Sequence, residues 1–253
     1  MTTPVRSSDQ GGVRLLELAR PPANAIDETL LAALDGALAE AEADPGVRAL
    51  LLTGSGPFFS GGFDLSAPRR DDEDAAEVVA LYRSSHRRLL GLPKPTVALV
   101  NGHAIAGGLV LALACDVRLA SDVPARIGLN EVAIGSSFPT AAIEIVRARL
   151  SARVASRLTL GAELHALAEG VALGVVERLI PAASALREAL ATAARLGTFP
   201  REVFAHTKRA LVGDALARID AVPMSAELAA AELWRAPESR AARAAQRERL
   251  QGR

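Results

Sequence analysis

Apolar positions follow a helical spacing in some stretches of the chain and form short continuous runs in others. Residues 1–12 are polar and predict a disordered tail, and residues 13–19 form the first extended stretch. Asp27 is placed to cap a helix whose leucines at positions 30, 31, 34 and 38 share one face. The apolar run over residues 47–53 then predicts a buried strand.

The next part of the chain repeats this order of strand, loop and helix. A glycine-rich loop covers residues 54–64, helical spacing covers residues 75–90, and an apolar strand follows at residues 96–100. The glycine-rich turn at residues 101–108 leads into the apolar residues 109–114, for which we expect a buried helix. Because each strand ends in a turn that contains glycine, the pattern predicts an α/β layered fold with a site at one edge of the sheets.

Helical patterning dominates after Pro139, with one short extended piece at residues 175–180. The predicted helices cover residues 147–159, 166–173, 184–196, 203–212 and 226–249. We expect residues 1–198 to form the core and residues 199–253 to form a C-terminal helical region that serves trimerisation or lies over the core as a lid.

Charge and composition narrow the class of protein. The 253 residues, of which 50% are hydrophobic, are enough to bury one large core. Basic and acidic residues number 29 each, so no net charge attracts the chain to nucleic acid or to an anionic membrane. No apolar run reaches the roughly 18 residues of a membrane-spanning helix, and the polar start has no apolar signal segment. We therefore expect a cytoplasmic protein with no nucleic-acid or membrane partner.

The cysteine and histidine content argues against two kinds of site. Cys115 is the only cysteine, which excludes an internal disulfide, and its apolar neighbours favour a packed core thiol over a nucleophile. The four histidines show no metal-ligand spacing, so no metal site is expected.

Two local sequences are candidates for chemistry. The glycine pair Gly107 and Gly108 at a helix start leaves the first amides open to a negatively charged group. An extended piece at residues 125–127 leads to Gly-Leu-Asn-Glu, which places Glu131 among apolar neighbours that would raise its pKa into a range useful for proton transfer. Together they suggest an oxyanion site with a base beside it. The alternatives are an ordinary tight turn for the glycines and an exposed turn carboxylate for Glu131.

Four ordered motifs resemble those of the crotonase (enoyl-CoA hydratase/isomerase) superfamily. They are Phe-Ser-Gly-Gly-Phe-Asp-Leu at residues 59–65, the turn at residues 101–108, Cys-Asp at residues 115–116 and Ile-Gly-Leu-Asn-Glu at residues 127–131. The resemblance, which runs from about residue 13 to 249, implies an α/β spiral of ββα units with a C-terminal helical trimerisation region. It also implies acyl-CoA thioester substrates and a homotrimer or dimer of trimers. No metal or redox cofactor is implied, since CoA is part of the substrate.

The resemblance also implies roles for individual residues. The backbone amides of Phe63 and Gly107 match the family's oxyanion hole, and Glu131 matches its base. Two preset amides can stabilise an enolate by roughly 2.7–4 kcal/mol each. The substrate-binding residues we expect are Ala23, Ala25, Ser60, Gly61, Asp64, Leu65, His103, Gly108 and Val110. For Asp64 a helix N-cap is the competing interpretation.

Val110 is the main departure from the family's hydratases, which resemble one another in having a second glutamate at that position. Hydration requires a water to be held and deprotonated, a task suited to paired carboxylates, whereas one base can move a double bond by taking the α proton and returning it at the γ carbon. The sequence is in this respect similar to the Δ3,Δ2-enoyl-CoA isomerases, and we expect isomerisation of 3-enoyl-CoA to 2-enoyl-CoA.

Two alternatives to the isomerase stay open. One is an enoyl-CoA hydratase or another CoA-ester lyase, for which Glu144 could supply a second acid while Ser136, Ser137 and Thr140 hold a water. The other is a non-catalytic acyl-CoA-binding protein, in which Glu131 would have no role in chemistry.

Overall fold

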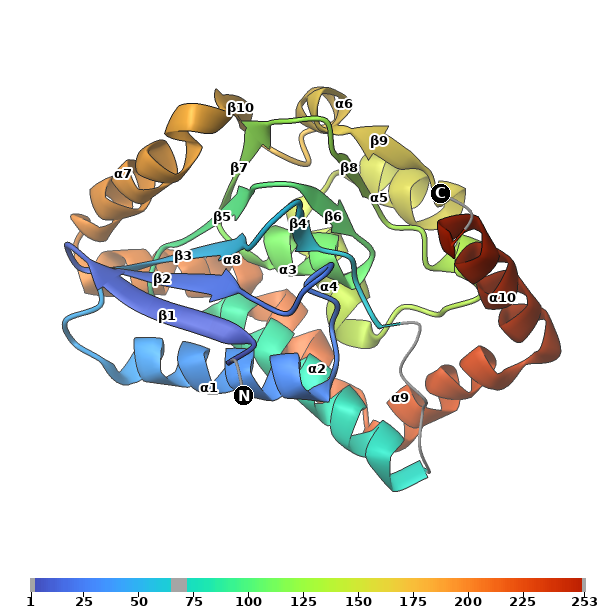
Figure 1. Ribbon diagram of the computed structural model, residues 1–253. Coiled ribbons are helices and arrows are strands. Elements are labelled where there is room, and N and C mark those ends of the chain that lie inside the picture. Colours follow the sequence, from blue (N-terminus) through green and yellow to red (C-terminus); the bar gives the residue numbers. More distant parts are fainter. Residues whose placement is uncertain (1–2, 65–71, 252–253) are drawn as a thin grey trace.

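The computed structural model describes residues 3–64 and 72–251, and in this part of the chain ten strands form two sheets (Figure 1). The larger sheet has six strands in the order β1-β2-β3-β5-β7-β10. All neighbouring strands are parallel except β1, which pairs antiparallel with β2 at one edge. The strands are β1 (Val5–Gln10), β2 (Val13–Leu18), β3 (Ala49–Gly54), β5 (Thr96–Val100), β7 (Val117–Asp122) and β10 (Arg178–Pro181).

The smaller sheet has the order β4-β6-β8-β9, with β4, β6 and β8 parallel and β9 antiparallel. Its short strands are β4 (Phe58–Ser60), β6 (His103–Ile105), β8 (Arg126–Gly128) and β9 (Leu164–Ala166). Three times along the chain a strand of the larger sheet is followed by a strand of the smaller sheet and then by a helix: β3-β4-α2, β5-β6-α3 and β7-β8-α4. These are the repeated ββα units that the sequence led us to expect.

Helices cover both faces of the larger sheet, with α7 on one face and α1 and α2 on the other (Figure 1). The helices are α1 (Glu28–Ala43), α2 (Asp72–Gly91), α3 (Gly107–Ala114), α4 (Thr140–Arg149), α5 (Ala152–Gly161), α6 (Leu167–Ala172), α7 (Ala185–Gly197), α8 (Arg201–Ala221), α9 (Met224–Ala231) and α10 (Pro237–Gln251). Within the described residues, three short 3-10 helices precede α4, α7 and α10: η1 (Val132–Ile134), η2 (Ala182–Ser184) and η3 (Glu232–Arg235).

The core has two layers because successive side chains of a strand point to opposite faces. In β3, Leu50 and Leu52 belong to the large cluster formed with α1, α2 and α3, whereas Ala49 and Leu51 belong to a smaller cluster under α7. Burial on both faces explains why the parallel strands are continuous apolar runs in the sequence.

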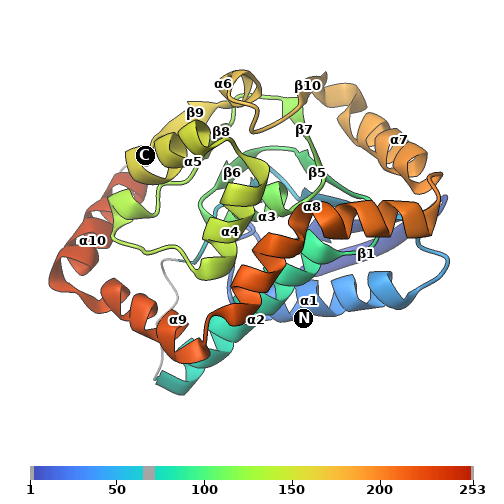
Figure 2. The same cartoon turned by 180° about the vertical axis from the view of Figure 1, so that it is seen from behind.

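The C-terminal helices continue around the core. Helix α8 lies along α2. Helices α9 and α10 follow, and α10 lies at the same end of the molecule as β9 (Figure 2). The predicted boundary between residues 198 and 199 falls just before α8, and the division into two domains stays a prediction. Among the residues described, no helix has the length and apolar character needed to cross a membrane.

Several elements follow the predictions closely. Helix α1 begins after Asp27, whose Oδ1 accepts a hydrogen bond of 2.9 Å from the Leu30 amide. The four leucines of this helix are buried, and β5 covers residues 96–100 as expected.

The predicted disordered tail is wrong, because residues 5–10 form β1. Gly11 and Gly12, with φ of +58° and +82°, make the tight turn that returns the chain onto β2. Only Val5 of this edge strand is buried, so its polar sequence gave no hydrophobic pattern.

Other boundaries also differ from the predictions. The helix expected over residues 147–159 is two helices that break at Leu150, and Ser151 caps the second. The helix expected over residues 226–249 is interrupted before Pro237, which opens α10. Strands β4 and β6 lie inside segments predicted as loop and turn, and no prediction covered β7.

Candidate active site

Two glycine-bearing loops meet beside the start of α3. The Ile26 amide donates to the Gly62 carbonyl (2.8 Å) and the Asp64 amide donates to the Ile26 carbonyl (3.0 Å), so Phe63 is held against Ile26. Gly62 has φ +80°, and a Cβ there would lie 2.8 Å from the Ile105 carbonyl oxygen and 3.3 Å from the Gly107 nitrogen. The close approach of the two loops therefore requires glycine at position 62.

The amides of Phe63 and Gly107 are both open. Within the described residues, neither donates a hydrogen bond to another backbone group or to a side chain. Gly107 is the first residue of α3, where an amide has no acceptor within its own helix. A Cβ on Gly107 would lie 3.9 Å from the Phe63 ring and 3.8 Å from Tyr82, which places the two loops side by side. Two neighbouring open amides can hold a developing oxyanion.

Glu131 reaches this place through the smaller sheet. The Ala106 amide donates to the Gly128 carbonyl (2.8 Å), which joins the turn before α3 to the end of β8, three residues before Glu131. The Glu131 carbonyl accepts from the Ser136 amide (2.9 Å), which closes the turn that follows. These backbone bonds fix the position of the carboxyl group without using it.

The Glu131 carboxyl group is desolvated and incompletely paired. The residue is 7% exposed, and its Oε2 is buried with no hydrogen-bond partner among the described residues. Burial raises the pKa of Glu131 to about 8, and a hydrogen bond from its own backbone amide opposes this effect. Ile127, Leu129 and Ile134 are buried as predicted, whereas Val132 is half exposed. A carboxylate in this state is a stronger base than an ordinary glutamate.

A stack of three rings, which the sequence analysis did not find, stands next to the two loops. The Phe63 and Tyr82 rings lie 5.2 Å apart, and the Tyr82 and His86 rings lie 3.7 Å apart. Burial, Glu131 and Glu227 together raise the pKa of Tyr82 well above its usual value, so its phenol keeps its proton. Burial lowers the pKa of His86 to about 4, so the imidazole is neutral. The signal in the sequence was a lone tyrosine on an otherwise ordinary helix.

A pocket opens beside Phe63 and Tyr82. Its walls come from α2, from the segment between η1 and α4, and from α9 and η3. They are mainly apolar and aromatic, and include Phe63, Tyr82, Phe138, Ala230 and Trp234. Glu227 of α9 also lines this pocket. The pocket therefore joins the loop that contains the open Phe63 amide to the C-terminal helices.

Residues 8–232 match the family described as "Enoyl-CoA hydratase/isomerase". The chain belongs to this enoyl-CoA hydratase/isomerase family. It is 43% identical over 175 residues to a putative enoyl-CoA hydratase of Thermus thermophilus, covering 67% of this chain and 68% of the relative. It is also 31% identical over 205 residues to the 2,3-dehydroadipyl-CoA hydratase of Escherichia coli, covering 81% and 80%.

Solved structures of the family confirm the predicted crotonase-like fold. The chain superposes on human mitochondrial delta3-delta2-enoyl-CoA isomerase with a TM-score of 0.93, 25% identity and 98% of both chains covered. Its TM-score is 0.82 against an enoyl-CoA hydratase/isomerase family protein from a Pseudomonas species, with 30% identity and coverage of 89% of this chain and 97% of that chain. The likeness thus extends over the C-terminal helices as well as the sheets.

In this family member the two segments that carry the predicted substrate-binding residues Ala23, Ala25, Ser60 and Gly61 are in contact. The Gly61 amide donates to the Ala23 carbonyl (2.8 Å), and the buried Ser60 hydroxyl donates to the Asn24 carbonyl (2.8 Å). The Ala25 carbonyl accepts from Arg20 (3.3 Å). Leu65 lies outside the described residues. Substrate binding by these loops stays a prediction.

Asp64 is tied into the same loop pair by an ion pair of 2.7 Å with Arg20. Helix α2 begins at Asp72, so Asp64 does not occupy its N-cap position.

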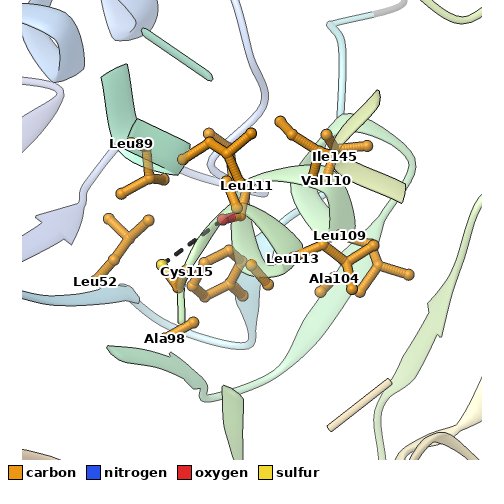
Figure 3. Close-up of a cluster of buried hydrophobic side chains, with 14 of the residues drawn as sticks. Leu52, Leu89, Ala98, Ala104, Leu109, Val110, Leu111, Leu113, Cys115 and Ile145 are labelled. Atoms are coloured by element: carbon orange, nitrogen blue, oxygen red, sulfur yellow. Dashed lines mark hydrogen bonds between the residues drawn. The ribbon is translucent and has the colours of Figure 1, made fainter. Parts of the chain in front are cut away.

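Three further predicted binding residues lie around α3. His103 accepts from the Arg126 amide through Nδ1 (3.1 Å) and its ring faces Phe58 at 4.8 Å, outside the lining of the described pocket. A Cβ on Gly108 would lie 2.3 Å from the Ser60 carbonyl oxygen, so this glycine is needed for packing. Val110 is buried among apolar side chains that include Ile145 (Figure 3). Their contact with substrate stays a prediction.

The surroundings of two other residues, Cys115 and Glu144, indicate a structural role. Cys115 is buried, its thiol lies 3.8 Å from the Leu111 carbonyl oxygen (Figure 3), and burial raises its pKa to about 12, as expected for a core thiol. Glu144 is also buried, but its two oxygens pair with Arg147 (3.0 Å) and Arg218 (2.6 Å). The carboxylate of Glu144 is thus engaged and is a poor candidate for a second acid.

Proposed function

We propose that the protein converts 3-enoyl-CoA to 2-enoyl-CoA. The observation that supports this most directly is that one site contains both a desolvated carboxyl group, that of Glu131, and two open backbone amides, those of Phe63 and Gly107. Membership of a family of acyl-CoA enzymes agrees with a thioester substrate.

The proposed reaction uses one base twice. The thioester carbonyl oxygen accepts hydrogen bonds from the Phe63 and Gly107 amides, and the Glu131 carboxylate removes the α proton. The electron pair of that C–H bond moves onto the carbonyl oxygen, giving a dienolate that the two amides stabilise. Glu131 then returns the same proton to the γ carbon, and the double bond ends between the α and β carbons. Atoms and charge balance without water or a cofactor.

The raised pKa of Glu131 suits this shuttle. The α proton of a thioester is a weak acid, and a base of pKa about 8 accepts it more readily than a solvated carboxylate would. The group must be ionised in the free enzyme, so we expect kcat/KM to rise with pH until about pH 8 and then level off.

Hydration is the competing reaction, and the named relatives in bacteria are mostly hydratases. Two features disfavour hydration here. The side chain of Val110 has no carboxyl group that could hold a water, and the carboxylate of Glu144 pairs with two arginines. We further propose a cytoplasmic homotrimer or dimer of trimers, for which a solution mass of three or six times 26.3 kDa is the expected result.

The test is to mix the purified protein with a medium-length 3-enoyl-CoA and to follow the ultraviolet absorbance of the conjugated product. We expect Glu131→Gln to lower kcat by about 10³-fold, the usual contribution of a general base. Glu163→Gln, at an exposed position, is the matched control and should react like the wild type.

Each other outcome has a definite meaning. If absorbance stays flat while added 2-enoyl-CoA is consumed, the enzyme is a hydratase. If neither substrate reacts, the proposed substrate class is wrong, and full activity of Glu131→Gln would make Glu131 a bystander.

A further inference from the structure

The pocket contains a second buried carboxyl group that the reaction above does not use. Glu227, in the first turn of α9, is 5% exposed and lines the pocket together with Phe63 and Tyr82. Its Oε2 accepts a hydrogen bond of 3.2 Å from the Thr140 amide at the start of α4. Its Oε1 is buried and has no hydrogen-bond partner within the described residues.

Packing alone does not account for this group. Glu144, a buried glutamate of α4, is paired through both oxygens with arginines, whereas Glu227 has one backbone donor on one oxygen. A carboxylate oxygen that is removed from water without a partner is costly, and native proteins usually satisfy such atoms with protein, water or ligand. A carboxylate oxygen without a proton can only accept hydrogen bonds, so its partner must be a donor.

The two serine hydroxyl groups of the pocket are directed elsewhere. Ser137 donates to the Ala230 carbonyl (2.9 Å), and Ser136 points to the Ser137 carbonyl (3.3 Å). The remaining walls near Glu227 are apolar or aromatic, as at Phe138, Ala230 and Trp234. With both serines engaged, the donor for Oε1 must be the Tyr82 phenol or a molecule bound in the pocket.

We propose that Glu227 accepts a hydrogen bond from a hydroxyl group on the acyl chain, so that the preferred substrates are hydroxylated acyl-CoA esters. This rests on the proposed function in one respect: an acyl chain whose thioester oxygen is held by the Phe63 amide must extend into the pocket that Phe63 lines. The apolar walls suit the carbon chain, and the single orphaned oxygen suits one donor.

A hydroxyl group fits this place better than other donors do. Its hydroxyl proton can be donated to Glu227 Oε1, and its oxygen can accept a hydrogen bond from the Tyr82 phenol, which keeps its proton. An alkyl chain without the hydroxyl would exclude water and leave the carboxylate unpaired. Sites built around a hydroxyl partner discriminate strongly against analogues that lack it, and we expect a preference of at least about tenfold.

The experiment measures binding of saturated esters, which have no double bond to move. Calorimetry compares a medium-chain acyl-CoA with esters of the same length that carry one hydroxyl group at successive carbons from the γ position outward. The proteins are the wild type, Glu227→Leu, Glu227→Gln and the control Glu232→Leu, which changes an exposed glutamate five residues further on. Circular dichroism checks that each variant is folded. If Glu227→Leu does not fold, Glu227→Gln takes its place in the comparison.

We expect the wild type and Glu232→Leu to bind one hydroxylated ester at least about tenfold more tightly than the plain ester, and Glu227→Leu to lose this ratio. Equal binding of plain and hydroxylated esters by the wild type, or a preference that survives Glu227→Leu and Glu227→Gln, would overturn the proposal. A hydroxyl preference that depends on Glu227 supports it even if the absorbance assay detects no isomerisation. If no ester binds, this proposal fails together with the acyl-CoA assignment.

Discussion

Two regions of the molecule surround their carboxyl groups in opposite ways. We call the first the α8 clasp: Asp116, Lys208, Arg149 and Thr96. In the clasp, Asp116 accepts hydrogen bonds from Lys208 Nζ (2.8 Å), Arg149 (3.0 Å) and both the amide and the hydroxyl of Thr96 (3.0 Å each). At the candidate active site, by contrast, Glu131 keeps a buried oxygen with no hydrogen-bond partner among the described residues.

The difference separates stability from function. The donors of the clasp come from β5, α4 and α8, so the Asp116 carboxylate links three elements. Both of its oxygens already accept hydrogen bonds from the protein. Glu131 is surrounded by apolar side chains and is held only through its backbone, so folding leaves its oxygen available. A buried group that folding leaves unsatisfied costs stability, and a site for chemistry is the place where such a cost is expected.

The largest effect should come from breaking the clasp. Lys208→Met removes one of the two cations that pair with the partly buried Asp116, and the free energy of unfolding should fall by about 3 kcal/mol, the lower end of the range for breaking a buried ion pair. Because the clasp does not touch the candidate site, kcat/KM for 3-enoyl-CoA should stay within about threefold of the wild type, a margin well below the losses of about 10²-fold to 10³-fold expected from site changes. Urea unfolding and the absorbance assay measure the two quantities.

The control for the clasp is Arg87→Met. Arg87 pairs with Asp220 of α8 at 2.5 Å, but both side chains are nearly half exposed. An exposed pair contributes about 0–1 kcal/mol, so this variant should unfold almost like the wild type. A loss of activity in folded Lys208→Met, or equal losses of stability in the two variants, would contradict the separation of roles.

A smaller effect, on kcat, is expected from Gly62→Ala at the candidate active site. The added Cβ would lie 2.8 Å from the Ile105 carbonyl oxygen at φ +80°, so the loop that presents the Phe63 amide must shift away from Gly107. Loss of one oxyanion donor lowers kcat by about 10²-fold or more, and we expect a fall of about 10²-fold in the absorbance assay.

Gly56→Ala is the matched control for the loop. Gly56 also has a positive φ, +69°, but a Cβ there would have nothing within 4 Å. Both variants carry backbone strain, and only Gly62→Ala disturbs the approach of the two loops. Similar activity in the two would mean that the Phe63 amide does not take part.

The sequence allowed a good part of the fold and the centre of the site to be predicted, because both depend on local patterns. Leucine spacing identified α1, apolar runs identified β3 and β5, and the glycine turn with Glu131 gave the candidate base. Polar strands at an edge leave no such pattern, which is why β1 was predicted as a tail. The break between α4 and α5 at Leu150 likewise leaves no mark in the helical spacing of the apolar residues.

The rest of the site depends on contacts between distant segments. Glu227 sits in the first turn of a helix, where an acidic residue is ordinary, and only the packing of α9 against α2 and α4 places it in the pocket. Tyr82 is unremarkable on α2 until Phe63 stacks on it. In the clasp, Asp116 and Lys208 are 92 positions apart, and neither neighbourhood indicates the other.

The most delicate test concerns the sign of the pH effect at Glu131. Its pKa is raised from 4.5 to about 8 in the folded protein, so between these values the folded state binds a proton that the unfolded state does not. The free energy of unfolding of the wild type therefore loses a contribution as pH rises through this interval, by up to about 1.4 kcal/mol per pH unit. Glu131→Gln has no such proton, so its stability relative to the wild type should increase by about 1 kcal/mol between pH 6 and pH 7. Glu163→Gln, at an exposed position, is the control, and we expect its difference from the wild type to be constant over the same interval. Urea unfolding at the two pH values measures both differences. If the difference for Glu131→Gln is also constant, the Glu131 carboxyl group is solvated in the folded protein, and the contrast drawn between a desolvated, unpaired Glu131 and a fully paired Asp116 is wrong.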